Sequence, residues 1–371
     1  MGILCSGDTM RKGFFLRGAA IVFIAALVLS VPAKGAGDLS AHSAILLDAM
    51  SGRVLYEKRA DDKHLIASTT KIMTGLLICE QCSPASPVKI PKSAVGVEGS
   101  SLYLQEGEIL SVKELLYGLL LRSGNDAAVA LALYCDGSVE AFADRMNEKA
   151  EDLGLYSTHF ANPHGLDSEE NYSTARDLAT LAAYAMENEL FREICATKTM
   201  TMGNRVLQNH NKLLWNYEGA VGVKTGFTKA AGRILVSAAE KNGRRLIAVT
   251  LQAPNDWKDH AKLLDYGFTQ FESRSVVDGG EIIRQIPVLS GKAESVSIVA
   301  EESVSCPVKE GETLILRYHV PRFVYAPVEK HTLAGYIEVL VDGDFVCKIP
   351  LTYEKTVEQS HKKKFSLFRS P

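Results

Sequence analysis

Three short polar motifs, which follow one another in a set order, constrain this chain more than any other feature. They are Ser68-Thr69-Thr70-Lys71, Ser123-Gly124-Asn125 and Lys224-Thr225-Gly226. Each string is common alone, but together they supply a serine with a nearby base, a polar bridge and a strand end that can bind a carboxylate. A fold that uses all three must bring a helix start, a turn between helices and a strand to one cleft.

The first motif has the spacing that a serine nucleophile and its base require. A serine hydroxyl is a weak nucleophile and needs a group that takes its proton. Positions i and i+3 of a helix share a face, so Lys71 lies one turn beyond Ser68 on the same side. The string alone carries little weight, because Ser86–Lys89 and Ser360–Lys363 repeat it. Only Ser68 precedes an apolar helical run, which predicts a desolvated lysine with a lowered pKa.

The second and third motifs would complete such a site. Ser123 and Asn125 fall in a break between two predicted helices, where Ser123 can pass a proton and Asn125 can bond a substrate amide. Lys224 adds positive charge, Thr225 can bond a carboxylate, and Gly226 lets a substrate backbone lie close. Taken alone, these two strings would be a plain helix–helix turn and an ordinary edge strand.

The N-terminus has the parts of a secretory signal. Basic residues precede an apolar stretch from Gly18 to Val31, and small residues around Gly35 and Ala36 offer a cleavage region. The stretch has the length of a signal-peptide core and is short for a membrane span. We therefore expect residues 1–35 to be a signal peptide and the chain to be exported, with an uncleaved N-terminal anchor as the alternative.

Composition narrows the class of protein further. The part of the chain after the signal is too long for one ordinary core and suits two domains. Lys and Arg number 41 against 44 Asp and Glu, and this near balance argues against a nucleic-acid partner. No later run is long and apolar enough to span a membrane.

The cysteines leave two interpretations open. The exported part keeps Cys79, Cys82, Cys135, Cys195, Cys306 and Cys347. The C-x-x-C spacing of Cys79 and Cys82 is typical of redox chemistry or of half a zinc site, but no second close pair or histidine pair follows. Scattered buried thiols are the favoured interpretation, and a Cys79–Cys82 disulfide stays open.

Hydrophobic periodicity predicts helices between early and late strands. We expect strands at 42–48, 53–58, 221–225, 232–239 and 246–251. We expect helices from Thr69, after a Ser111–Glu114 capping box, at 126–134, at 173–187 and at 258–271. This order predicts an α/β (α+β) core in which both ends of the domain meet in one antiparallel sheet, flanked by helices.

From about residue 273 the pattern changes to short alternating segments. They lie at 295–299, 313–318, 335–341 and 345–351, with a hairpin turn at Asp342-Gly343. We therefore divide the chain into a signal peptide at 1–35, a catalytic domain at 36–272, a small all-β, sandwich-like domain at 273–355 and a basic-aromatic tail at 356–371.

Longer strings around the motifs resemble one known family. They are Ala67–Thr74, Asn162–Leu166 (NPHGL), Tyr172–Leu178 (YSTARDL) and Gly222–Thr228. With the three motifs in this order, the chain resembles the D-alanyl-D-alanine carboxypeptidases of the low-molecular-mass, serine-type penicillin-binding protein family. The likeness runs from about Asp38 to Phe268, and the β-rich C-terminal domain is similar too. It implies a β-lactamase/transpeptidase-like catalytic fold.

The resemblance implies an activity and roles for the site residues. The substrate would be a peptidoglycan stem peptide ending in D-alanyl-D-alanine, cleaved through an acyl-enzyme on Ser68. The oxyanion hole would be the backbone N–H groups of Ser68 and Phe227. β-Lactam antibiotics would acylate Ser68 as substrate mimics. The cycle needs no metal or organic cofactor, and the enzyme would work at the extracytoplasmic face of the cell membrane or in the cell wall.

The chain departs from the family pattern at three places. Val221 stands where relatives often have an aspartate, and Ile66 stands where many have a proline. The arginine that assists substrate carboxylate binding has no counterpart in the stretch from Ala253 to Lys258. In the tail, lysines 362–364 and Arg369 alternate with aromatic and aliphatic residues, which favours a weak peripheral contact with an anionic membrane, with a disordered tail as the alternative.

Three other functions remain as alternatives. A serine β-lactamase shares the motifs but usually needs a carboxylate that activates the deacylating water, and Glu169 and Glu170 lack the usual context. A D,D-endopeptidase would use the same Ser68 and Lys71. A penicillin-sensing or wall-binding protein would carry the motifs as a relic.

Overall fold

The structure of the chain is a computed structural model, and it describes residues 35–360. Most of the predicted signal peptide and of the basic tail lies outside the described residues, so both stay predictions. Within residues 35–360, none of the helices combines the length and apolar composition needed to cross a membrane.

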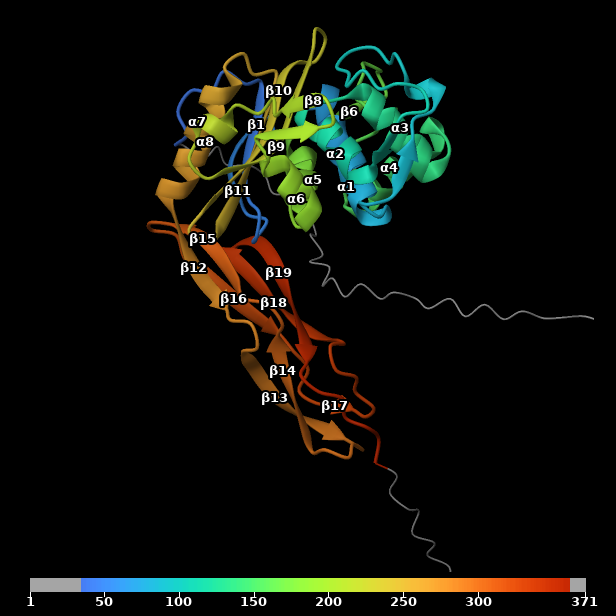
Figure 1. Cartoon of the computed structure of the whole chain (residues 1–371). Coiled ribbons are helices and arrows are strands. Elements are labelled where there is room, and N and C mark those ends of the chain that lie inside the picture. The colour runs from blue at the N-terminus through green and yellow to red at the C-terminus, as the bar shows by residue number, and fades with distance from the viewer. Residues whose placement is uncertain (1–34, 361–371) are drawn as a thin grey trace, which may run out of the picture.

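A five-stranded antiparallel sheet, in the order β2-β1-β11-β10-β9, is the centre of the first domain (Figure 1). Its strands are β1 (Ser43–Asp48), β2 (Val54–Lys58), β9 (Ala220–Thr228), β10 (Gly232–Lys241) and β11 (Arg244–Leu251). Because β1 pairs with β11, the first and last parts of the domain meet in one sheet, as predicted. The strand that carries Lys224-Thr225-Gly226, β9, lies at the edge of the sheet.

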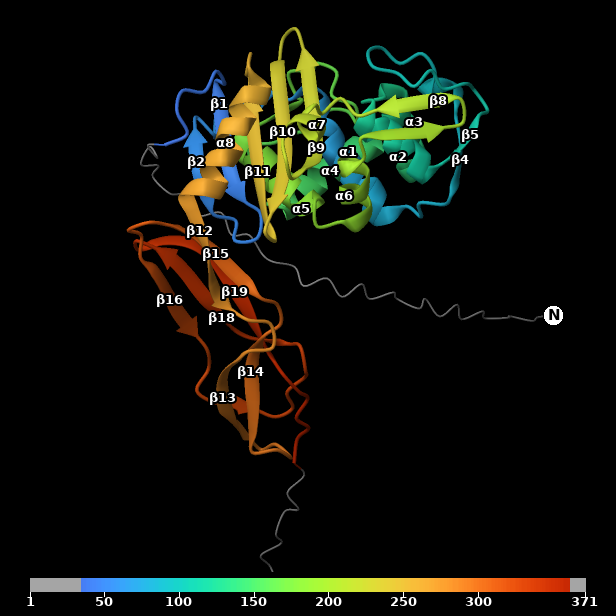
Figure 2. The same ribbon diagram turned by 60° about the vertical axis from the view of Figure 1, so that its left-hand side comes forward.

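Both faces of the sheet are covered by helices, because alternate side chains point to opposite sides. On β1, Ile45 and Leu47 join one buried core, and Ala44 and Leu46 join the other. Helix α8 (Asp256–Gln270) covers one face, and α5 (Ala175–Ala185) and α6 (Glu189–Ala196) cover the other. Figure 2 shows this layering, with α8 in front of the sheet.

The remaining helices form a cluster beside β9. They are α1 (Lys71–Gln81), α2 (Val112–Leu121), α3 (Asn125–Asp136) and α4 (Val139–Asp152), with the short α7 (Leu213–Asn216) nearer the sheet. The predicted capping box starts α2, where Ser111 Oγ accepts from Glu114 N at 3.2 Å. The prediction of a helix from Thr69 needs one correction, because a 3-10 turn at Ala67–Thr70 precedes α1.

Three two-stranded ribbons connect these elements. β3 (His64–Leu65) pairs with β6 (Tyr172–Ser173), β4 (Pro87–Lys89) with β5 (Ile109–Ser111), and β7 (Thr199–Met202) with β8 (Arg205–Gln208). A second 3-10 turn spans Lys92–Ala94. The β3–β6 ribbon joins the chain just before Ser68 to the segment that leads into α5, and so fixes the entry to the first motif.

The second domain is all β, as predicted, and has its own apolar core. Its strands are β12 (Phe271–Val277), β13 (Ile282–Leu289), β14 (Ser295–Ala300), β15 (Val304–Lys309), β16 (Leu314–His319), β17 (Val324–Tyr325), β18 (Leu333–Val341) and β19 (Asp344–Tyr353). Six of them form the sheet β16-β18-β19-β14-β13-β17, and β12 pairs with β15. Arg53 joins the domains through Glu312 at 2.7 Å and the carbonyl of Pro307. Figure 1 shows the second domain below the five-stranded sheet of the first.

Candidate active site

The first motif places a buried amine beside a partly exposed hydroxyl. Ser68 lies in the 3-10 turn and Lys71 is the first residue of α1, so the two side chains share a face. Nζ of Lys71 is 3.1 Å from Oγ of Ser68. Lys71 is fully buried, whereas Ser68 lines a pocket that opens to solvent. This is the geometry of a serine whose proton can pass to a neighbouring amine.

The surroundings of Lys71 favour its neutral form. Burial lowers the pKa of Lys71 well below its usual value, and the nearby cation of Lys224 lowers it further, while Asp126 opposes both. The amine also donates to Asn125 Oδ1 at 2.7 Å and to the carbonyl of His164. These oxygens hold Nζ in place, and the lowered pKa favours the neutral amine that can accept a proton.

The segment Asn162–Leu166, which carries the His164 carbonyl, forms a tight turn that packs on α1. Asn162 Oδ1 accepts from Gly165 N at 2.7 Å, and Thr74 Oγ1 donates to Pro163 O at 2.7 Å. Gly165 has φ +85°, and a Cβ there would lie 1.9 Å from Ala67 O and 3.0 Å from Ser68 N. The turn therefore needs glycine because it touches the backbone at Ala67 and Ser68.

The second motif connects two helices and fastens a loop over the pocket. Ser123 has φ +62°, an uncommon conformation for a residue with a side chain, and α3 begins two residues later. Asn125 N donates to Ser100 O at 2.7 Å, and its Nδ2 donates to Glu98 O at 2.5 Å. Ser123 lines the pocket, and its buried Oγ has no hydrogen-bond partner among the described residues. That hydroxyl is free to bond a ligand.

The third motif closes the other side of the site. Lys224 is 1 % exposed, its Nζ donates to Thr225 O at 2.8 Å, and burial lowers its pKa to about 7. Thr225, Gly226 and Phe227 line the pocket. A Cβ on Gly226 would lie 3.1 Å from Ile66 O, so the glycine lets β9 pack against the turn that carries Ser68.

The pocket holds about 700 Å³ and brings the predicted residues together. Ser68, Ser123, Thr225, Gly226 and Phe227 line it, and Lys71, Asn125 and Lys224 lie buried behind them. Its lining also includes Trp215, Arg233, Asp256 and Trp257. The proximity of the eight residues is observed, whereas their catalytic and binding roles stay predictions.

Arg233 is a pocket residue that the sequence reasoning missed. The family pattern indicated a carboxylate-binding arginine near residues 253–258, but Arg233 reaches the pocket from β10. Three hydrogen bonds, of 3.1, 3.0 and 2.9 Å, hold its guanidinium against Asp256, which lies within residues 253–258. The feature that could have identified Arg233 as a pocket residue is the β9–β10 hairpin, because its register places Arg233 opposite Phe227.

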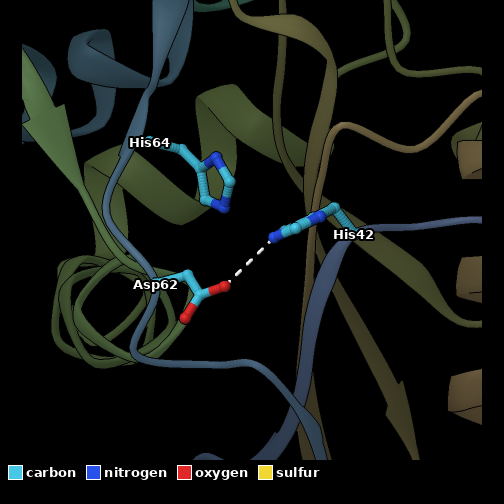
Figure 3. A group of neighbouring side chains, drawn as sticks. All are labelled: His42, Asp62 and His64. Carbon is cyan, nitrogen blue, oxygen red and sulfur yellow. Dashed lines mark hydrogen bonds and ion pairs between the residues drawn. The ribbon is translucent and has the colours of Figure 1, made fainter.

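A group of three potential metal ligands lies outside this pocket (Figure 3). The ligand atoms of His42, Asp62 and His64 fall within 4.8 Å of one another. Protein contacts already account for them: His42 Nε2 is 3.0 Å from Asp62 Oδ2, and His64 Nε2 is 3.1 Å from Ser43 Oγ. Arg59 Nη1 lies 3.4 Å from His42 Nδ1, and the positive charge of this guanidinium disfavours the binding of a metal cation. We do not assign a metal to the group.

The fold and the pocket together define a class of protein. A partly exposed serine, a buried lysine one helical turn away and an edge strand with Lys-Thr-Gly are the parts of an active-site-serine peptidase that forms an acyl-enzyme.

Family comparisons identify the class more closely. Residues 30–255 match the model of the D-alanyl-D-alanine carboxypeptidase family, and residues 271–359 match that of the penicillin-binding protein 5 C-terminal domain. The chain therefore belongs to the D-alanyl-D-alanine carboxypeptidase family, and it is a serine-type peptidase.

Relatives agree over most of the length. The D-alanyl-D-alanine carboxypeptidase DacF of Bacillus subtilis is 33 % identical over 86 % of this chain and 86 % of its own. DacC of Escherichia coli is 33 % identical over 96 % of this chain and 92 % of its own. Among solved structures, penicillin-binding protein 5 of Haemophilus influenzae has a TM-score of 0.75 at 30 % identity, covering 87 % of this chain and 98 % of its own.

Proposed function

We propose that this D-alanyl-D-alanine carboxypeptidase removes the terminal D-alanine from peptidoglycan stem pentapeptides through an acyl-enzyme on Ser68. The observation that carries the proposal is the 3.1 Å separation between Ser68 Oγ and the fully buried Nζ of Lys71. In the acylation step, Oγ attacks the carbonyl of the penultimate D-alanine and Nζ of Lys71 takes the proton. The C–N bond then breaks, and D-alanine leaves as its amine receives a proton through Lys71 and Ser123. Water hydrolyses the ester in the second half of the cycle.

The position of β9 at the edge of the sheet supports a binding mode in which the substrate peptide pairs with this strand. A peptide can lie along an exposed strand edge and bond its backbone to it. The C-terminal carboxylate of such a peptide would meet Thr225 and the charges of Lys224 and Arg233. Asn125 would bond a substrate amide, and the N–H groups of Ser68 and Phe227 would form the oxyanion hole. β-Lactams carry a carboxylate and an acylating carbonyl, so they would occupy the same places.

The positions of the acidic residues support this function over that of a β-lactamase. Glu169 and Glu170 are exposed and do not line the pocket. Among the described residues that line it, the single carboxylate is Asp256, which Arg233 already holds in three hydrogen bonds. The pocket therefore offers no free carboxylate to activate a deacylating water, and we expect slow release of a β-lactam.

We further propose that the chain is exported and that its tail contacts the membrane surface. The proposal rests on the N-terminal signal pattern and on the basic and aromatic residues after Glu358. A chain trimmed after Glu358 should keep its activity and lose any association with anionic vesicles. Loss of activity on trimming would refute a purely tethering role.

The central test compares the protein with its Ser68→Ala variant. Both are incubated with a labelled pentapeptide ending in D-alanyl-D-alanine, and free D-alanine is assayed. A parallel gel follows covalent labelling by fluorescent penicillin. We expect release and labelling by the wild type and neither by the variant. Labelling without release would favour the endopeptidase or the sensor, fast penicillin turnover would favour the β-lactamase, and release by the variant would refute the role of Ser68.

A further inference from the structure

Two cysteines from separate helices meet at the end of the helical cluster that lies away from the pocket. Cys82 directly follows α1, and its N–H donates to Ile78 O at 3.0 Å. Cys135 lies in the last turn of α3, which packs against α1. Cys135 Sγ is 3.4 Å from Oε1 of Gln81, the residue before Cys82, and the two thiols are close enough to shift each other's pKa. The contact therefore joins two helix ends.

Cys82 differs from the other thiols in reactivity. Cys82 and Cys135 are partly exposed, as are Cys79 and Cys347, whereas Cys195 and Cys306 are buried. The hydrogen bond from Cys135 lowers the pKa of Cys82, whereas burial raises the pKa of Cys79 to about 12. Since the thiolate is the reactive form, Cys82 is the stronger nucleophile of the C-x-x-C string.

The opposite ends of the same two helices carry the site. Lys71 is the first residue of α1 and Asn125 the first of α3, and Nζ of Lys71 bonds Asn125 Oδ1. Helices of 11 and 12 residues are about 16 to 18 Å long, so the thiol pair is too far from Ser68 to touch a substrate. It can act on the site only by holding α1 and α3 together.

We propose that Cys82 and Cys135 form a reversible disulfide that fastens the C-terminal ends of α1 and α3. The oxidant is a small-molecule disulfide such as oxidised glutathione. The Cys82 thiolate attacks one sulfur of that disulfide, a mixed disulfide forms, and one small thiolate leaves. The departing thiolate takes the proton of Cys135, and the Cys135 sulfur then attacks the Cys82 sulfur and expels the second small thiolate. Two protein thiols are oxidised and one small disulfide is reduced to two small thiols, which take up the two protons that the protein thiols give up.

The cross-link closes a long loop that contains α2 and the Ser123 turn. Closing a loop of this length removes much conformational freedom from the unfolded chain. For a domain of this size we expect the oxidised form to melt about 5 to 15 °C higher than the reduced form. Acylation of Ser68 at room temperature should stay within about twofold of the reduced enzyme, because both helices are already in contact.

The test uses the full chain, incubated either with oxidised glutathione or with a reducing agent. Peptide mapping by mass spectrometry should find a Cys82–Cys135 cross-linked peptide only after oxidation, and thermal unfolding should show the upward shift. Cys135→Ser should abolish both effects. The matched control, Cys347→Ser, removes a thiol in the second domain and should preserve both.

Three outcomes would overturn the proposal. They are a cross-link of Cys79 to Cys82, no cross-linked peptide at an excess of oxidised glutathione, and a thermal shift that survives Cys135→Ser. The mapping is done on the wild type, so the result does not depend on the folding of a variant. Because penicillin labelling reports Ser68 separately, failure of the disulfide would leave the proposed function untouched.

Discussion

The contact between Gly165 and the nucleophile's backbone leads to a quantitative prediction for Gly165→Ala. The new methyl carbon would lie 1.9 Å from Ala67 O and 2.5 Å from Ala67 C. Real Cβ atoms essentially never approach within 3.0 Å, so one of the two backbones must move by more than about 1 Å. The movement falls on the peptide group that carries the N–H of Ser68, which lies 3.0 Å from the same Cβ position.

Two separate costs follow from this substitution. Alanine at φ +85° costs about 1 to 2 kcal/mol of stability whatever surrounds it. A displacement of about 1 Å in the site costs about 100-fold in rate, because attack geometry and oxyanion bonding are lost together. We therefore expect acylation by fluorescent penicillin and release of D-alanine both to fall about 100-fold in a protein that still folds.

Gly137→Ala is the matched control. Gly137 also has a left-handed backbone, with φ +78°, but its Cβ would meet nothing within 4 Å. The control should lose about the same 1 to 2 kcal/mol in thermal unfolding and keep full activity. The reasoning is refuted if Gly165→Ala acylates within threefold of the wild type, or if Gly137→Ala loses activity to the same degree.

Three further predictions concern charge and protonation. Arg233→Gln should raise the KM for the pentapeptide about 10- to 100-fold, as expected for losing a charged hydrogen bond. Asp256→Asn keeps the guanidinium of Arg233 and should raise the KM less. The pH profile of kcat/KM should rise as Lys71 loses its proton, because the pKa of Lys71 is lowered. It should fall above about pH 7, where Lys224 loses the charge that attracts the substrate carboxylate. A profile still rising at pH 10 would contradict this role of Lys224. His260 is buried, and burial lowers its pKa from 6.5 to about 3. The unfolded chain therefore binds the proton more readily than the folded chain. Stability should decline as the pH falls from 6.5 toward 3. In His260→Gln this part of the decline should disappear from the thermal unfolding curves.

Much of the fold follows from local patterns that stand in the sequence. The capping box at Ser111 starts α2 where predicted, and the short apolar runs of β1 and β11 form strands where predicted. These features depend on residues a few positions apart, so their physics is local. The 3-10 turn before α1 was not predicted, because it forms where the chain is held between β9 and the turn at Gly165.

The site was predictable to the extent that its chemistry lies in short strings. Ser68 and Lys71 are one helical turn apart in any helix, so their proximity needs no tertiary information. The contact of Lys71 with Asn125 needs tertiary information, because 54 positions separate the two residues. Arg233 was missed for a related reason, since its place in the pocket depends on the pairing of β10 with β9 and on its bond to Asp256.

The sequence by itself indicated the class of reaction and the order of the elements that carry the site, and it predicted Ser68 as the nucleophile and Lys71 as its base. Those properties follow from residue types and spacings, which act over one or two turns of chain. Tertiary structure alone decided the protonation of the lysines, the need for glycine at 165, the arginine in the pocket and the meeting of Cys82 with Cys135. Burial, charge proximity and steric contact are sums over neighbours in space, and most of those neighbours are distant in sequence.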